Sequence, residues 1–191
     1  IDMLLTACLT AGLYMYWRWE KTGRKGWILL FYLFMTAGLF SKGPGVLVFP
    51  VLFVLTRTWR SPHRMRHWIG LAAGCSFCVL LYALWAVPAH LAFAQEAGSD
   101  AGTVLGSNLV RQTLGRFFLG VSHANWPWYY LTTLPVDWLP WTLFLPWIIY
   151  WVWTHRKDTP AISFLLSWTL PAFIFFTIAI GKRGVYLLPL F

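Results

Sequence analysis

The side chains best suited to chemistry in this sequence are a few cations, one carboxylate, one histidine and one tyrosine. Arginine offers a planar fork that matches two phosphate oxygens, lysine offers a point charge, and a tyrosine hydroxyl donates one neutral hydrogen bond. A carboxylate can accept the proton of an attacking hydroxyl group. Such a set could hold a phosphate group and stabilise the charge that develops on it. The candidates are Asp2, Lys42, Arg116, His123, Lys182, Arg183 and Tyr186.

These side chains lie in a chain whose composition is typical of a membrane protein. Of its 191 residues, 59% are hydrophobic and 11% are charged, whereas soluble proteins average about 25% charged residues. This excludes an ordinary soluble domain, and it excludes a disordered segment, which needs low hydrophobicity and high charge. In such an apolar chain, the net charge of +9 indicates cytoplasmic loops rather than a nucleic-acid partner. We therefore expect an all-α, polytopic transmembrane bundle that forms one domain over residues 1–191.

Seven apolar segments are candidates for membrane helices, because a spanning helix needs about 20 apolar residues. They cover residues 1–17, 27–40, 45–56, 68–88, 134–153, 160–180 and 186 onward. The chain begins and ends inside apolar runs, so we interpret it as an internal piece of a larger polytopic membrane protein.

The charges of two loops decide how the second and third segments are arranged. Each segment is too short to cross a full bilayer, so the two form either one long helix or a hairpin that turns at residues 43–45. The loop before them (residues 18–25) is basic, and so is the loop after them (residues 57–66). Only a hairpin places both loops on the cytoplasmic face, as the positive-inside rule prefers. With this topology, ten of the fifteen lysines and arginines are cytoplasmic.

The other basic residues reach the external face, against that rule. Asp2 reaches the same face. Positive charge on this side of a membrane usually meets something anionic, and a phosphate at headgroup depth is the simplest candidate. The five external cations are Lys42, Arg111, Arg116, Lys182 and Arg183.

A long external stretch, residues 89–133, carries two of these cations. Its middle, NLVRQTLGRFFLGV (residues 108–121), has apolar residues at helical spacings, which predicts a helix lying in the membrane interface. The following NWPWYYL (residues 125–131) is typical of an aromatic belt at the headgroups. Two interpretations stay open: an amphipathic anchor without chemistry, or a helix that holds Arg111 or Arg116 over a lipid phosphate.

Several motifs, taken in order, resemble those of the aminoarabinose transferase and protein O-mannosyltransferase group. Residues 182–189 (KRGVYLLP) are similar to its Lys-Arg-x-x-Tyr-Leu-Leu-Pro signature, and residues 41–44 (SKGP) to its Thr/Ser-Lys-Gly-Pro turn. Residues 115–130 resemble its external stretch, with Arg-Phe, then His, then Pro-Trp-Tyr-Tyr. The runs at residues 2–5 (DMLL) and 139–141 (LPW) resemble two further helix starts.

This resemblance implies a GT-C integral-membrane glycosyltransferase. Such an enzyme moves a hexosyl or pentosyl group from a polyprenyl-phosphate-linked donor to a lipid or protein acceptor, such as lipid A, at the external face. A bacterial inner membrane is the implied location, with membrane lipids as further partners. The sequence identifies no metal-binding set and no cofactor, and it leaves open whether the reaction needs a divalent metal.

The resemblance also assigns roles to the candidate residues. Arg116 and Tyr186 are implied ligands of the lipid phosphate, with Lys182, Arg183 and Lys42 as further cations beside it. His123 is implied in contact with the acceptor or the sugar. For Asp2 a supporting catalytic role is implied, because the family's main acidic motif would lie upstream of Ile1.

Rival interpretations remain open. A transporter or flippase-like protein could bind lipid-linked glycans through the same cations without transferring the sugar, although transporters tend to hold charges near the bilayer midplane. A scaffold subunit without chemistry is a third possibility. Single residues also have structural explanations: Lys182 and Arg183 could snorkel to headgroups, Asp2 could cap its helix, and Lys42 could form a structural ion pair.

Overall fold

The computed structural model describes residues 2–59, 61–96, 125–126, 128–156, 159–182, 184 and 187. The regular elements of this part of the chain are helices, which confirms the all-α class. In chain order they are α1 (Asp2–Thr22), α2 (Lys25–Lys42), η1 (Pro44–Leu47), α3 (Val48–Thr58), α4 (Arg64–Glu96), α7 (Tyr129–Asp137), η3 (Trp141–Phe144), α8 (Leu145–His155) and α9 (Pro160–Ile178).

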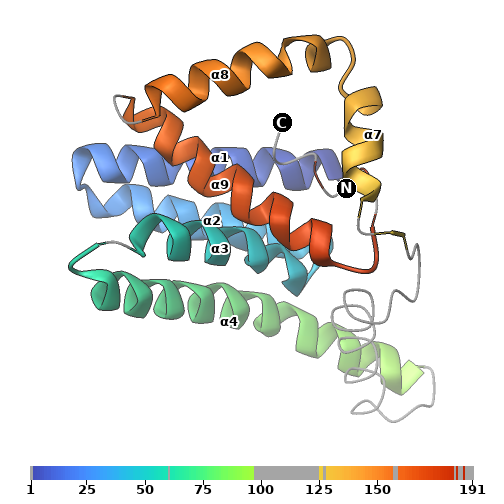
Figure 1. Cartoon of the computed structure of the whole chain (residues 1–191). Helices are drawn as coiled ribbons and strands as arrows, with labels where there is room; N and C mark the ends of the chain where they lie inside the picture. The colour runs from blue at the N-terminus through green and yellow to red at the C-terminus, as the bar shows by residue number, and fades with distance from the viewer. Residues whose placement is uncertain are drawn as a thin grey trace.

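Two glycines end the first two helices and reverse the chain. Gly23 (φ 66°) and Gly43 (φ 83°) adopt left-handed backbone conformations, which other residues reach only with strain. The amide of Gly23 donates to the carbonyl of Trp19 at 2.8 Å, and that of Gly43 to the carbonyl of Leu39 at 2.7 Å. The predicted hairpin is confirmed: α2 runs to one end of the bundle and α3 returns, so both basic loops lie at the same end (Figure 1).

Aromatic rings on α1, α2, α3 and α9 fill the core. The ring of Tyr16 meets those of Phe53 and Phe31 edge-on, with centroids 4.9 and 5.4 Å apart. The ring of Trp168 of α9 also meets that of Phe53 edge-on, with the centroids 5.8 Å apart. Edge-on pairs of this kind are attractive beyond the area that they bury. The helix α4 joins the same core through its buried residues Leu71 and Cys78.

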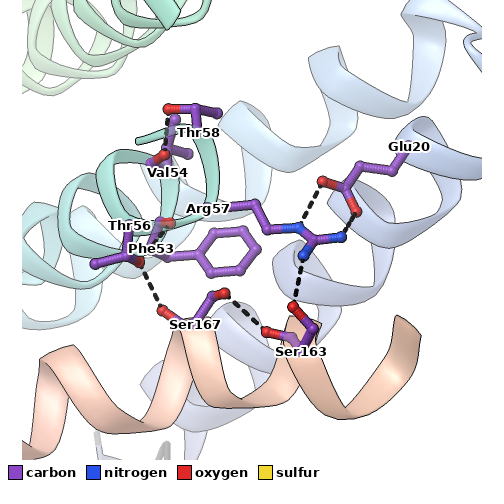
Figure 2. Close-up of polar contacts among 8 residues, drawn as sticks. All are labelled: Glu20, Phe53, Val54, Thr56, Arg57, Thr58, Ser163 and Ser167. Carbon is purple, nitrogen blue, oxygen red and sulfur yellow. Dashed lines mark hydrogen bonds and ion pairs between the residues drawn. The ribbon is translucent and has the colours of Figure 1, made fainter. Parts of the chain in front are cut away.

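A cluster of polar contacts ties three helices together at the end that holds the basic loops (Figure 2). Arg57 of α3 donates from Nε and Nη2 to the two carboxylate oxygens of Glu20 of α1, at 3.0 and 3.1 Å. Its Nη1 donates to the hydroxyl oxygen of Ser163 of α9, at 3.2 Å. One helical turn along α9, the hydroxyl of Thr56 donates to the carbonyl of Ser167 at 3.0 Å. A bidentate guanidinium–carboxylate pair fixes geometry as well as charge, so this cluster sets how α1, α3 and α9 meet.

The predicted span at residues 134–153 is wrong as a single helix. The structure divides it: α7 ends at Asp137, a short 3-10 helix follows at Trp141–Phe144, and α8 begins at Leu145. The apolar pattern is continuous, but Pro140 interrupts it, whereas Pro146 lies in the first turn of α8, where a proline is tolerated. A proline lacks a backbone N–H and disfavours a helical residue before it, so the helix does not continue through Pro140.

The boundary predicted at residue 88 also differs. Pro88 lies inside α4, which continues to Glu96; the apolar residues after it prolong the helix into the stretch that we expected to be external loop. The helix expected at residues 108–121 lies outside the described residues.

Among the described residues, two helices are long and apolar enough to cross a membrane. They cover residues Arg64–Ala92 and Pro160–Ile178, of 29 and 19 residues, and 22% of each apolar window is buried in the bundle. The low buried share fits helices whose outer faces meet lipid.

Candidate functional site

The end of the bundle opposite the basic loops gathers the candidate residues that the structure describes. The start of α1, the end of α2, α7 and the end of α9 all lie at this end (Figure 1). In the predicted topology this is the external end. The sequence therefore anticipated correctly that Asp2, Lys42 and Lys182 share one end of the molecule.

Asp2 and Lys42 form an ion pair between the first turn of α1 and the last turn of α2. The Nζ of Lys42 donates to Oδ1 of Asp2, although the two residues are 40 positions apart. The pair is accessible, because 30% of the lysine side chain and 38% of the aspartate side chain are exposed. A phosphate could therefore approach the ammonium from outside while the carboxylate orients it, so a structural pairing and a ligand role are compatible.

Lys182 lies in a different environment. It is 2% exposed, and its Nζ donates to the carbonyl of Ala179 at 2.6 Å and to the carbonyl of Asn125 at 3.3 Å. Burial removes water from the ammonium group and lowers the pKa of Lys182. The ammonium of this lysine is thus engaged with backbone oxygens, whereas the side chain of Lys42 stays partly exposed.

Two residues at this end had no role in the sequence interpretation. The backbone carbonyl of Asn125 accepts a hydrogen bond from the ammonium of Lys182, and the Nδ2 of Asn125 donates to the carbonyl of Lys182 at 3.4 Å. Asp137 ends α7 next to the signature segment: a Cβ built at Gly184 would lie 3.6 Å from its Oδ2. Asp137 can be seen in the sequence as a carboxylate close to the predicted apolar segment at residues 134–153, but no pattern links Asn125 to a residue 57 positions later.

The other candidates, Arg116, His123, Arg183 and Tyr186, lie outside the described residues. Their roles as ligands of a phosphate, an acceptor or a sugar stay predictions.

Comparison with known proteins adds to this geometry. No family model matches the chain. Over 206 aligned residues, which take in 100% of the chain, it is 29% identical to the undecaprenyl phosphate-alpha-4-amino-4-deoxy-L-arabinose arabinosyl transferase of Edwardsiella ictaluri (strain 93-146). The chain is similar to the aminoarabinose transferases over its whole length. A 67-residue part is 40% identical to the transferase of the same name from Yersinia pestis (strain Pestoides F), covering 35% of the chain and 12% of that relative.

The fold of this aminoarabinose transferase-like chain matches a solved structure. The crystal structure of ArnT from Cupriavidus metallidurans bound to undecaprenyl phosphate superposes with a TM-score of 0.64 and 18% identity, over 99% of the chain and 34% of ArnT. The helices therefore have the arrangement of part of a GT-C membrane fold, as the resemblance implied. The chain spans about a third of the length of the relative that it matches throughout, since it covers 34% of that protein.

Proposed function

We propose that the chain acts in a membrane glycosyltransferase reaction at the external face of a bacterial inner membrane. The donor is a sugar on polyprenyl phosphate, a pentose by analogy with the named relatives, and the acceptor is a hydroxyl group of a lipid. The observation that carries this proposal is the similarity to an arabinosyl transferase over 100% of the chain. The match to the fold of ArnT supports it, as does the accessible ion pair at the external end.

The proposed chemistry assigns work to two kinds of side chain. The bond between the sugar carbon and the phosphate oxygen breaks, the acceptor oxygen bonds to that carbon, and a carboxylate takes the acceptor's proton. Negative charge grows on the leaving phosphate, where fixed cations stabilise it. Lys42 supplies one such cation and Asp2 orients it. We further propose Arg116, Arg183 and Tyr186 as phosphate ligands and His123 as a contact to the acceptor or sugar.

The decisive experiment measures transfer by the full-length protein in proteoliposomes. The substrates are an undecaprenyl-phosphate-linked aminopentose and a lipid acceptor. Arg116→Ala is expected to lower turnover by about 10²–10³-fold, as the loss of one charge-stabilising donor does, while membrane insertion and unfolding temperature stay unchanged. Arg24→Ala, an exposed arginine at the opposite end of the bundle, is the matched control and should retain full turnover.

Two results would contradict the proposal. If the Arg116 variant turns over like the wild type, Arg116 does not belong to the site. If the wild-type protein moves the lipid-linked sugar across the membrane and never transfers it to the acceptor, the protein is a transporter rather than a transferase.

A further inference from the structure

The end of α9 is fastened to a distant segment by hydrogen bonds that centre on Lys182. The ammonium of Lys182 donates to the carbonyl of Asn125 at 3.3 Å. In return, the side-chain amide of Asn125 donates to the carbonyl of Lys182 at 3.4 Å, and its backbone amide donates to the carbonyl of Ile180 at 3.3 Å. These bonds run in both directions, so they join residues 180–182 to the residue that shortly precedes α7.

The same ammonium also closes the end of α9. It lies 2.6 Å from the carbonyl oxygen of Ala179, which is the C-cap residue of that helix. The carbonyl end of a helix carries partial negative charge and has unpaired acceptors. A buried ammonium is costly unless acceptors surround it, and here two backbone oxygens provide that environment.

A lysine held in this way points its charge into the protein. Lys182 is 2% exposed, whereas the side chain of Lys42 at the same end is 30% exposed. A phosphate ligand must present its donors to the substrate, and Lys42 does so while Lys182 does not. The first residue of the KRGVYLLP segment thus has a different task from the one that its charge suggests.

We propose that Lys182 is a positioning residue. Its ammonium locks the end of α9 to Asn125 and so fixes the place from which the rest of the KRGVYLLP segment departs, without touching the phosphate of the donor. We call this junction between residues 180–182 and Asn125 the lock. The inference rests on the proposed function only for the ligand-binding experiment below, because the lock itself can be measured in the absence of substrate.

Amide hydrogen exchange in the unliganded, full-length protein tests the lock directly. The backbone amide of Asn125 is bonded to Ile180, so its exchange reports whether the two segments are joined. In Lys182→Met we expect this amide to exchange at least about tenfold faster, because local opening replaces the lock, while amides in α2 and α3 keep their wild-type rates. Lys182→Arg keeps donors for both carbonyls and should recover part of the protection.

Ligand binding provides the second readout. Undecaprenyl phosphate without a sugar is added to each variant, and the rise in unfolding temperature is measured against the same variant alone. Lys182→Met should keep a rise close to that of the wild type, whereas Lys42→Met should lose most of it. Asn125→Ala removes only the return bond from the side chain, so it tests the lock if the Lys182 variant fails to fold.

The outcomes separate the two proposals. If Lys182→Met keeps the Asn125 amide protected and loses the ligand-induced rise, Lys182 is a phosphate ligand and the inference is wrong. If neither Lys182→Met nor Asn125→Ala speeds the exchange of the residue-125 amide, there is no lock. If undecaprenyl phosphate stabilises no variant, including the wild type, the proposed function fails, and the exchange rates still decide the role of Lys182.

Discussion

Gly74 of α4 lies where the ring of Tyr32 of α2 presses against the helix. A Cβ built at Gly74 would lie 1.9 Å from Cζ of Tyr32 and 2.1 and 2.5 Å from its two Cε atoms. One helical turn earlier, the carbonyl of Gly70 accepts a hydrogen bond from the Tyr32 hydroxyl at 3.1 Å. The missing side chain of Gly74 thus makes room for one aromatic ring, the device by which small residues let membrane helices approach each other.

Gly74→Ala must therefore displace the ring. Side chains on a helix have few χ1 positions, so the displaced tyrosine loses its hydrogen bond to Gly70, worth about 1 kcal/mol. The displaced ring also strains the packing around it, which lowers the free energy of unfolding by about 1–3 kcal/mol. The better helix propensity of alanine offsets about 0.5–1 kcal/mol of this loss. We expect a net loss of about 1–3 kcal/mol. For a domain of this size that corresponds to a fall in Tm of about 2–12 °C.

The assay is thermal unfolding of the full-length protein in detergent, followed by tryptophan fluorescence. Gly70→Ala is the matched control: nothing lies within 4 Å of a Cβ there, so its Tm should be equal to or slightly above that of the wild type. In a Tyr32→Ala background the ring is gone, and Gly74→Ala should cost nothing further. The reasoning is refuted if Gly74→Ala is as stable as Gly70→Ala, or if its cost is undiminished without the ring.

Two further predictions concern the two ends of the bundle. A double-mutant cycle of Arg57→Met and Glu20→Gln, measured by unfolding temperature, should give a coupling free energy of about 1–2 kcal/mol. The reason is that the ion pair is bidentate and its side chains are only 23% and 24% exposed. A coupling near zero would mean that solvent screens the pair. The topology can be tested in a protein without its native cysteines by introducing one cysteine at Arg24 or at Trp126, which is 78% exposed. The two cysteines should react with an impermeant maleimide from opposite sides of the membrane. The Trp126→Cys variant should label in intact cells and the Arg24→Cys variant only after lysis, and the reverse pattern would overturn the orientation.

The sequence predicted the helical class and the path of the first four helices well, because both depend on local signals. Apolar segments and their lengths identify helices, and the charges of the intervening loops choose the hairpin at Gly43. The break near Pro140 was missed because the apolar pattern continues through it. A proline in an apolar pattern is compatible with a continuing helix or with a break, since Pro88 lies within α4 while the helical pattern is broken at Pro140. Only the surrounding packing distinguishes the two cases.

The candidate site divides in the same way. The sequence by itself determined the residue types of the candidate site, the resemblance that they carry, and the placement of Asp2, Lys42 and Lys182 at one end of the bundle. Only the tertiary structure decided that Lys42 stays accessible beside Asp2 and that Lys182 is buried against Asn125. The physical reason is that the charge of a lysine is a property of its type, whereas its task depends on partners, and these lie 40 and 57 positions away in the chain.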